Sequence, residues 1–471
     1  MQDEYKNRIK QLKGTNKFVY DHKTTTWYSY DGFWHKVLVV AEQFNRQDSE
    51  AVIAVMDNSI NLFLLYFSCM LTGKIIIPID PYKAKNEINE IVSEHPGVPV
   101  LDDNSFSVDV HDDNDAIKSE LDLNYLIDKI DLDKTFMITY TSGSTGRAKG
   151  VIHTLRNLFR AAEAFGNATG LNESYTMCHV MPMTYMAGIL NTIMMPFICG
   201  CRIALLPRFD VMSAVSFWKK VEALKINAFW FSPTMLNLLM TVDRKAKARS
   251  YLSEHETRFF VGTAPLHEST RKKFEEKYGI ELLQSYGLSE TLFIATELPS
   301  YDNDHKSVGT VLSDVKMTFY PDQEIGIQVP WMFSGYSNED TGSYFSDGNY
   351  MSGDLGRLDN RNELFLTGRK KDLIVKGGMN ISPAQIENCL INAGIVSECA
   401  VAGVKYGDEE SIICWYVSLG AKELSVSEVN QLIESTISRF ARVDRFIPLQ
   451  QIPKNLNGKI DKQKLKEELQ G

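Results

Sequence analysis

The sequence predicts an α/β fold: a large N-terminal domain of helices and sheets that includes a β-rich subdomain, followed by a small C-terminal α+β domain. Over the first three hundred residues, short β-branched runs alternate with stretches of helical periodicity, as in βαβ units and parallel sheets. From about residue 308 the runs become short and alternating, separated by Gly, Asp and Asn. A chain of 471 residues also exceeds one ordinary core, so two or three domains are expected.

The elements of the first half follow from these runs. Strands are expected at residues 51–56, 74–79 and 98–101, with helices at 60–71 and 83–95 between and after them. Further buried strands are expected at residues 136–140, 177–181, 202–206, 228–232, 259–262 and 282–285. The most apolar stretch, 189–206, is interrupted by polar residues, which favours buried helix and strand over a membrane span.

The second half divides at a basic cluster, residues 369–372. Before it, strands are expected at 316–320, 326–329 and 364–367. After it, about a hundred residues have their own pattern: a helix at 383–392, strands at 398–404 and 411–419, and a helix at 426–440. We therefore predict one domain over residues 1–370 and a second over 371–471.

Composition narrows the class of protein. A formal net charge of -10 argues against nucleic acid as the main partner, since phosphate binding needs a basic face. The seven cysteines are scattered and form no Cys-x-x-Cys pair, a pattern typical of buried thiols in a reducing compartment. The charged first residues have no apolar stretch of a secretory signal. A cytoplasmic protein without a membrane span is expected.

A loop rich in glycine and hydroxyl residues follows the strand at 136–140. Small residues let the backbone curl so that amide hydrogens converge on one point, and a lysine at the end supplies a positive charge. This composition suits the β- and γ-phosphates of a nucleotide. The kinase-type loop Gly-x-x-x-x-Gly-Lys-Ser/Thr is absent, because Gly150 follows the lysine. The candidate phosphate-binding residues are Thr141, Ser142, Gly143, Ser144, Thr145, Gly146 and Lys149.

The loop resembles the phosphate-binding signature of the adenylate-forming superfamily, the AMP-dependent synthetases and ligases that include acyl-CoA synthetases, luciferases and adenylation domains. Further segments resemble the family's motifs in the same order over nearly the whole chain. The usual loop proline is replaced by Ala148. The matching residues are Gly262, Thr263, Ala264 and Pro265 on the adenine side, Ser285, Tyr286, Gly287, Ser289 and Glu290, then Asp354, Arg369 and finally Lys459.

The resemblance implies a role for each of these residues and implies ATP, Mg²⁺ and CoA or phosphopantetheine as cofactors. Tyr286 would stack on adenine, Asp354 would bind the ribose, and Glu290 would bind the magnesium ion. Lys459 would act at the substrate carboxylate and α-phosphate, with Thr141, Glu290 and Arg369 as further catalytic residues. The C-terminal domain would be mobile, turning about Lys371 so that Gly377 and Gly378 line a tunnel for the thiol.

The residue types support several of these roles on chemical grounds. A carboxylate such as Glu290 beside a phosphate loop suits an oxygen-preferring magnesium ion. Asp354, after a Ser-Gly turn, can accept from both ribose hydroxyls. Arg369 can pair with ribose or phosphate, or form a salt bridge at the domain junction. We find no Ser-His-Asp or Cys-His pattern of a hydrolase and no His-Glu-x-x-His zinc motif.

The stretch 182–190 bears on which carboxylic acid is the substrate. It has no acidic residue to hold the ammonium group of an amino acid, so it argues against an amino-acid substrate. Aryl-acid relatives tend to carry His-Asn where this chain has Tyr185 and Met186. We therefore expect an acyl-CoA ligase for a hydrophobic acid, with an apolar pocket. Its expected lining is Tyr185, Met186, Gly188, Phe231, Gly262 and Gly287.

Two other functions remain open from the sequence. One is a stand-alone adenylation enzyme that loads an acyl or aryl acid on an acyl or peptidyl carrier protein. The other is a catalytically inactive, adenylate-binding regulatory protein. Retention of Lys149, Glu290, Asp354, Arg369 and Lys459 together argues against the inactive protein.

Overall fold

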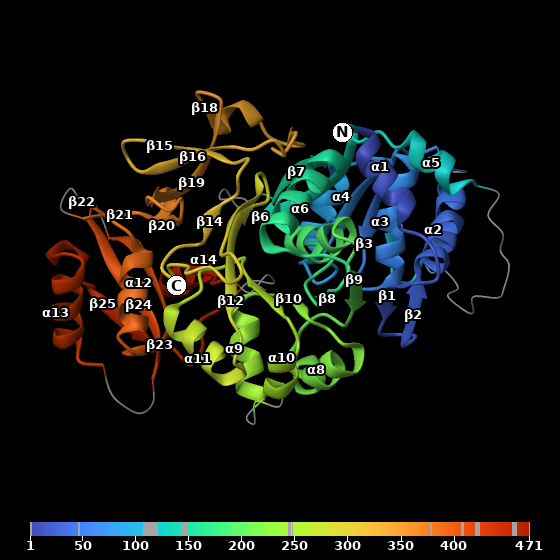
Figure 1. Cartoon of the computed structure of the whole chain (residues 1–471). Helices are drawn as coiled ribbons and strands as arrows, with labels where there is room; N and C mark the ends of the chain where they lie inside the picture. Colours follow the sequence, from blue (N-terminus) through green and yellow to red (C-terminus); the bar gives the residue numbers. More distant parts are fainter. Residues whose placement is uncertain are drawn as a thin grey trace.

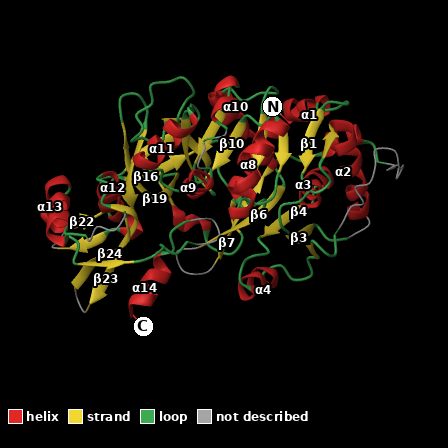
Figure 2. Ribbon diagram, turned by 90° about the horizontal axis from the view of Figure 1, so that it is seen from below, coloured by secondary structure: helices red, strands yellow, loops and turns green. Residues whose placement is uncertain are grey.

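The computed structural model describes residues 2–45, 48–106, 121–142, 148–243, 246, 248–376, 379–406, 409–419, 424–454 and 459–470. In Figure 1 the chain passes from blue N-terminal elements at one end of the molecule to orange and red C-terminal elements at the other. Sheets with helices packed against them form the larger part (Figure 2). The predicted fold class is confirmed.

The first large sheet has six strands in the order β17-β7-β6-β4-β3-β5. Strands β3, β4, β5 and β6 run parallel, as the alternation of strand and helix predicted, whereas β6 and β7 are an antiparallel hairpin. The strands are β3 (Ala51–Val55), β4 (Ile75–Ile79), β5 (Val100–Asp102), β6 (Thr135–Ser142), β7 (Ala148–Thr154) and β17 (Gly335–Tyr336).

Helices of this part are α1 (Gln2–Gln11), α2 (Tyr30–Asn45), α3 (Ile60–Thr72), α4 (Lys85–Ser93), α5 (Leu123–Lys129) and α6 (Leu155–Thr169). Helix α3 begins where the Ser59 side chain accepts a hydrogen bond from the Leu62 amide. Eleven residues of α3 are buried. Because the helix lies inside the molecule, its residues are apolar on all sides.

The second large sheet has nine strands in the order β14-β13-β12-β11-β10-β8-β9-β1-β2. Its central strands are parallel, and the pairs β12–β13, β13–β14 and β1–β2 are antiparallel. The strands are β1 (Lys17–Asp21), β2 (Thr26–Ser29), β8 (Thr176–His179), β9 (Arg202–Leu205), β10 (Ala228–Phe231), β11 (Arg258–Val261), β12 (Leu282–Leu288), β13 (Leu292–Thr296) and β14 (Thr310–Val311).

Two cores cover the two faces of this sheet. Because successive strand residues point to opposite faces, Trp230 of β10 lies in the core shared with α6, while Phe231 lies in the other core. In the first core, the rings of Phe165 and Phe293 stack at 4.2 Å. The remaining helices are a π-helix (Ala187–Met194), α7 (Met195–Ile198), α8 (Val211–Leu224), α9 (Pro233–Val242), α10 (Arg249–Glu254) and α11 (Glu268–Tyr278).

The predicted β-rich subdomain is a five-stranded antiparallel sheet. It consists of β15 (Lys316–Phe319), β16 (Glu324–Gln328), β18 (Phe345–Ser346), β19 (Asn349–Leu358) and β20 (Leu364–Arg369), with a 3₁₀ turn at Thr341–Tyr344. Asp354 was expected after a Ser-Gly turn, and the turn is present inside β19: Gly353 has φ 69°, and the Asp354 amide donates to Ser352 Oγ at 3.1 Å. Residues 352–354 form an irregularity in the pairing of β19 with β16, and Asp354 pairs with Arg369 of β20.

The C-terminal elements have their own core and lie at one end of the molecule (Figure 1). They are a 3₁₀ turn (Lys370–Asp372), β21 (Ile374–Lys376), β22 (Met379–Ile381), α12 (Pro383–Asn392), β23 (Val396–Tyr406), β24 (Glu409–Ser418), α13 (Val426–Thr436), a 3₁₀ turn (Arg439–Ala441), β25 (Arg445–Pro448) and α14 (Lys462–Gln470). The helix expected at 426–440 ends earlier, because Ser438 is extended, with φ -174° and ψ 162°. No helix in the described ranges is long and apolar enough to cross a membrane.

Candidate active site

The predicted phosphate loop joins the two antiparallel strands of the β6–β7 hairpin. Thr141 pairs with Lys149 and Ser142 with Ala148, so the two ends of the loop are held side by side. Gly143, Ser144, Thr145 and Gly146 lie outside the described residues. The described ends show that the sequence motif spans a hairpin, with its lysine on the returning strand.

Lys149 is buried among polar and aromatic groups. Its Nζ lies 2.9 Å from Glu339 Oε2 and within hydrogen-bonding distance of the Tyr344 hydroxyl. Nζ also lies 4.2 Å from the centre of the Tyr344 ring and 5.4 Å from that of Tyr336. Burial alone would lower the pKa of Lys149, but the hydrogen bonds to Tyr344 and Glu339 outweigh it and raise the pKa. The lysine therefore stays positively charged and restrained.

Glu290 lies in the turn between β12 and β13, where Gly287 has a specific structural role. A Cβ atom at Gly287 would lie 2.1 Å from the carbonyl oxygen of Leu292, so the close approach of the two strands requires glycine there. The Glu290 carboxylate accepts a hydrogen bond of 2.8 Å from the Tyr336 hydroxyl, and its carbonyl accepts one of 2.9 Å from the Phe333 amide. The carboxylate is thus fixed by the segment around β17.

His153 links the phosphate hairpin to the Glu290 turn. It lies on β7, and its Nε2–H donates to the Ser289 carbonyl at 2.7 Å. The ring is fully buried, and its Nδ1 has no hydrogen-bond partner among the described residues. Burial lowers the pKa of His153 from 6.5 to about 4, so the ring is neutral at neutral pH.

Tyr286, Asp354 and Arg369 are brought together from three strands. The Tyr286 hydroxyl donates to Asp354 Oδ2 at 2.6 Å, and Arg369 Nε lies 2.8 Å from Asp354 Oδ1. Burial and the neighbouring Asp354 charge raise the pKa of Tyr286 well above its usual range. Tyr286 is therefore a neutral donor whose ring orientation is set by the carboxylate.

The segment Gly262, Thr263, Ala264 and Pro265 follows the carboxyl end of β11, beside β12. A Cβ atom at Gly262 would lie 3.2 Å from the Ser285 carbonyl oxygen and 3.4 Å from the Trp230 ring. Thr263 has φ 71°, an uncommon conformation for threonine. Its buried hydroxyl has no partner among the described residues. Strained backbone at the carboxyl edge of a parallel sheet is a frequent setting for ligand sites.

The residues predicted for the acyl pocket occupy different surroundings. Tyr185 is half-buried, and Met186 is buried where the π-helix begins. A Cβ atom at Gly188 would lie 1.9 Å from the Pro182 carbonyl oxygen, so this glycine permits a close backbone contact. Phe231 is 0% exposed and packs between Phe209 and Phe259 in the second core, at ring distances of 5.3 Å. The apolar pocket remains a prediction.

The predicted residues of the C-terminal part lie in two places. Lys371 is in the 3₁₀ turn directly after β20, and Lys459 is exposed beside the bridge between Lys454 and Ile460. Gly377 and Gly378 lie outside the described residues. Two polar contacts join α12 and its preceding residue to the large domain: Ser382 Oγ donates to the Thr367 carbonyl at 2.8 Å, and His267 Nδ1 lies 3.1 Å from Asn388 Oδ1.

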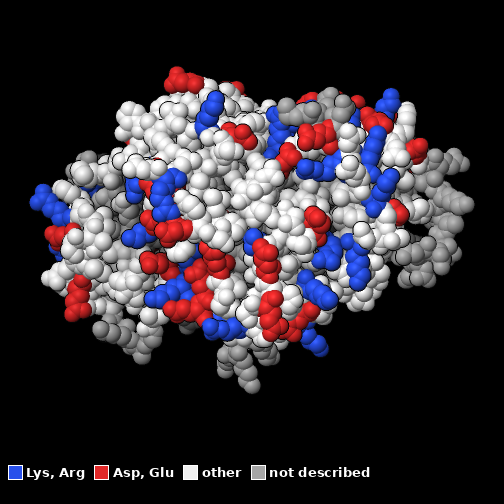
Figure 3. Space-filling view, in the orientation of Figure 1, with Lys and Arg blue, Asp and Glu red and all other residues white. Residues whose placement is uncertain are grey.

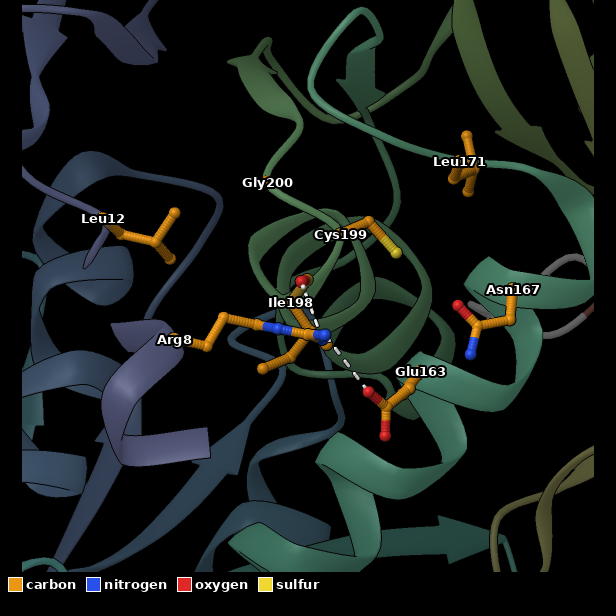
Figure 4. Close-up of a pocket in the computed structure, with 8 residues that line it drawn as sticks. All are labelled: Arg8, Leu12, Glu163, Asn167, Leu171, Ile198, Cys199 and Gly200. Atoms are coloured by element: carbon orange, nitrogen blue, oxygen red, sulfur yellow. Dashed lines mark hydrogen bonds and ion pairs between the residues drawn. The ribbon is translucent and has the colours of Figure 1, made fainter. Parts of the chain in front are cut away.

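Two surface cavities are formed by other parts of the chain. One, of about 250 Å³, lies between α1, α6 and α7, where Arg8 bridges Glu163 and the Ile198 carbonyl (Figure 4). The other, of about 400 Å³, lies between α6 and β14. Neither is lined by a predicted site residue. Figure 3 shows charges of both signs interspersed over one face, without a continuous basic surface.

Comparison with known proteins identifies the family of this chain. A family model described as "AMP-binding enzyme" matches residues 6–336, and one described as "AMP-binding enzyme C-terminal domain" matches residues 385–459. The chain belongs to the AMP-binding enzyme family. It is therefore an enzyme of the adenylate-forming, acyl-CoA synthetase-like ligases.

Relatives in this family include long-chain-fatty-acid–CoA ligase FadD13 of Mycobacterium tuberculosis, 27% identical over 89% of this chain and 88% of that protein. A 2-succinylbenzoate–CoA ligase of Listeria monocytogenes is 29% identical over 73% of this chain and 72% of that protein. Among solved structures, ATP-bound MatB from Rhodopseudomonas palustris has a TM-score of 0.83 at 21% identity, over 98% of both chains. MenE from Bacillus subtilis with its acyl-adenylate has a TM-score of 0.79 at 22% identity, over 98% and 97%.

The structure adds residues to the site that the sequence did not single out. Tyr336, Glu339 and Tyr344 contact Lys149, and Tyr336 also contacts Glu290. These residues lie almost two hundred positions after the phosphate loop, in a segment without a distinctive composition. The only local signal is the Gly-Tyr dipeptide at 335–336, which is too common to indicate function.

Proposed function

We propose that this enzyme uses ATP to convert a carboxylic acid into an acyl-AMP with release of pyrophosphate, and then transfers the acyl group to a thiol. The favoured acceptor is CoA and the favoured acid is hydrophobic. One observation carries the proposal: a single strand and its turn present Tyr286, bonded to Asp354, and Glu290, bonded to Tyr336 beside Lys149. Groups suited to a nucleoside and groups suited to phosphates therefore adjoin.

The nucleoside end would be held by Tyr286, Asp354 and Arg369. The hydroxyl of Tyr286 is already engaged with Asp354, so the ring is oriented before a base arrives. Each carboxylate oxygen of Asp354 accepts one hydrogen bond from Tyr286 or Arg369 and has a further lone pair for a ribose hydroxyl. Preorganised groups bind with less loss of side-chain entropy.

The phosphate end would use Thr141, the rest of the loop and Lys149, with Glu290 for magnesium. No group of three or more His, Cys, Asp or Glu side chains that could hold a metal occurs in the described part of the chain. A single carboxylate fits magnesium that is bound mainly through nucleotide phosphates, which is its usual mode in enzymes. When bound, the ion would neutralise phosphate charge. Lys149 adds a fixed positive charge from the other strand.

Lys459 would assist the first half-reaction. Attack of a carboxylate on the α-phosphorus brings two anions together, so a positive side chain between them lowers the barrier by charge neutralisation. The lysine lies in the C-terminal part of the chain, which is joined to the rest through the segment containing Lys371. We propose that this domain, from about residue 371, turns about Lys371 between the two half-reactions.

The proposals for acid and acceptor are supported by the relatives and by the pocket residues. FadD13 and the 2-succinylbenzoate ligases are both named as CoA ligases, which favours CoA over a carrier protein. The segment containing Tyr185 and Met186 has no charged side chain, and Trp230 and Phe293 lie on the Gly262 side of the sheet. These surroundings suit an apolar acyl group.

The test is acid-dependent exchange of pyrophosphate into ATP, measured over short, medium and long-chain, aryl and amino acids. We expect exchange with a hydrophobic acid, and thioester formation when CoA is added. Comparing CoA with a phosphopantetheinylated carrier protein separates the two acceptors. Lys459→Ala should abolish exchange while leaving nucleotide binding intact. Absence of exchange with every acid, together with no effect of Lys459→Ala, would refute the proposed ligase activity and support an adenylate-binding regulatory protein.

A further inference from the structure

We propose that Tyr336 is a positioning residue of this site, which couples the carboxylate of Glu290 to the amine of Lys149. The proposal rests on the proposed function, because it assigns to these two residues the metal and phosphate ends of bound MgATP. Tyr336 itself reaches both of them: its hydroxyl contacts Glu290, and its ring faces Lys149.

The backbone around Tyr336 is attached to the strand that returns from the phosphate loop. Strand β17 pairs with β7, with Tyr336 opposite Val151. The Ser337 amide donates to the Gly150 carbonyl at 2.8 Å. Asn338 continues this contact, because its Oδ1 accepts from the Gly150 amide at 3.2 Å and its Nδ2 donates to the Ala148 carbonyl at 2.9 Å. Tyr336 therefore moves with the hairpin that carries Lys149.

The Tyr336 side chain is fixed at both its hydroxyl and its ring. The hydroxyl donates to Glu290 Oε1 at 2.8 Å and lies 3.1 Å from the Tyr350 hydroxyl. The ring packs edge-on against Phe333 at 4.9 Å and against Tyr344 at the same distance. Because the side chain is only 8% exposed, loss of the hydroxyl cannot readily be replaced by water. The Glu290 carboxylate is thus oriented by a directional hydrogen bond from Tyr336, alongside one from Tyr350.

The same ring forms part of the surroundings of Lys149. Nζ lies 5.4 Å from the Tyr336 ring centre and also contacts the Tyr344 ring and the Glu339 carboxylate. Tyr344 and Glu339 restrain the lysine, and Tyr336 relates its position to that of Glu290. Binding of MgATP requires Lys149 and Glu290 to keep fixed relative positions, since the lysine and the metal act on the same phosphate chain.

The test compares Tyr336→Phe with a matched control, Tyr5→Phe. Both substitutions keep the ring and remove a hydroxyl that donates to a carboxylate, at 2.8 Å to Glu290 for Tyr336 and at 2.7 Å to Glu163 for Tyr5. Tyr5, however, lies on α1 among residues without a role in the proposed site. Two quantities are measured: the Mg²⁺ concentration for half-maximal pyrophosphate exchange, and the rise in Tm with MgATP in the absence of acid. Binding of a fluorescent ATP analogue in EDTA reports the nucleotide without metal.

We expect Tyr336→Phe to raise the half-saturating Mg²⁺ concentration by roughly tenfold, the factor for one hydrogen bond to a charged group. The MgATP-induced rise in Tm should shrink, whereas binding in EDTA should stay within about twofold, because the ring over Lys149 remains. Excess Mg²⁺ should restore kcat. Tyr5→Phe should match the wild type in all of these measurements.

The proposal is overturned if Tyr336→Phe has wild-type Mg²⁺ dependence and a wild-type MgATP-induced rise in Tm. Equal changes in Tyr336→Phe and Tyr5→Phe would also overturn it, because they would indicate a general effect on stability. Failure of the proposed function is a different result: the wild type would give no exchange with any acid. The MgATP-induced rise in Tm needs no acid, so it tests Tyr336 in that case as well.

Discussion

Lowering the pH should destabilise the large domain through His153, the buried histidine that joins the phosphate hairpin to the Glu290 turn. The ring is fully buried and donates from Nε2 to the Ser289 carbonyl, so a second proton would have to sit on Nδ1, which has no acceptor among the described residues. In the unfolded chain the same ring takes up a proton freely. The perturbation is therefore a fall in pH, compared between the wild type and His153→Gln.

The magnitude follows from the shift in the pKa of His153 from 6.5 to about 4. Above pH 6.5 both states are neutral and the free energy of unfolding does not depend on this group. As the pH falls below 6.5, His153 binds a proton in the unfolded state but not in the folded state, so the free energy of unfolding decreases. Below about pH 4 both states bind the proton, and the free energy of unfolding no longer changes through this group. The loss is about 2 kcal/mol at pH 5 and about 3 kcal/mol in full.

The assay is urea unfolding at pH 7.5 and pH 5, followed by tryptophan fluorescence. Glutamine can keep a donor for the Ser289 carbonyl but does not titrate, so His153→Gln should lose about 2 kcal/mol less than the wild type between these two pH values. His35, exposed on α2, provides the control, and His35→Gln should keep the wild-type difference. If His153→Gln and the wild type lose the same stability, the reasoning about the buried ring is wrong.

Three further predictions concern Asp354, Gly287 and His305. Asp354→Asn removes the charge that pairs with Arg369 and should raise the Kd for ATP about tenfold or more in equilibrium binding, with an unchanged Kd contradicting the assigned role. Gly287→Ala would place a Cβ atom 2.1 Å from the Leu292 carbonyl oxygen and should cost about 1–3 kcal/mol in urea unfolding, so wild-type stability would contradict the packing argument. The pKa of His305 is raised by its hydrogen bond to a buried glutamate, so its contribution is present at low pH and is lost as pH rises through that raised value. His305→Gln should remove this dependence from the Tm measured between pH 6 and 8.5, and persistence of the dependence would exclude His305 as its source.

Much of the fold could be predicted because its signals are local. The runs at 51–56, 228–232 and 259–262 became strands within one or two residues of their expected bounds, since buried parallel strands are continuous apolar stretches. The helix Pro383–Asn392 matches its prediction, with proline at the first turn. The strand through Asp354 was not predicted, because Ser-Gly favours a turn locally. The structure keeps that turn as an irregularity inside β19, which only the pairing with the neighbouring strands reveals.

The face on which a side chain lies was harder to predict than the strand that carries it. Phe231 and Trp230 are neighbours on β10, and the sequence analysis assigned Phe231 to the acyl pocket, an assignment that stays a prediction. The structure places Trp230 beside Gly262 and Phe231 in the second core. In a strand buried on both faces the pattern has no polar side to set the register, so the sequence holds no signal for this choice.

The sequence by itself determined the family, the order of its motifs and the chemical character of each site residue, because these depend on residue type and spacing along the chain. Tertiary structure alone decided which other residues hold the site residues in place. Tyr336 contacts Glu290 and Lys149 because β17 pairs with β7 and lies beside the β12–β13 turn. A hydrogen bond between segments so far apart is set by strand pairing and packing, and no local pattern records it.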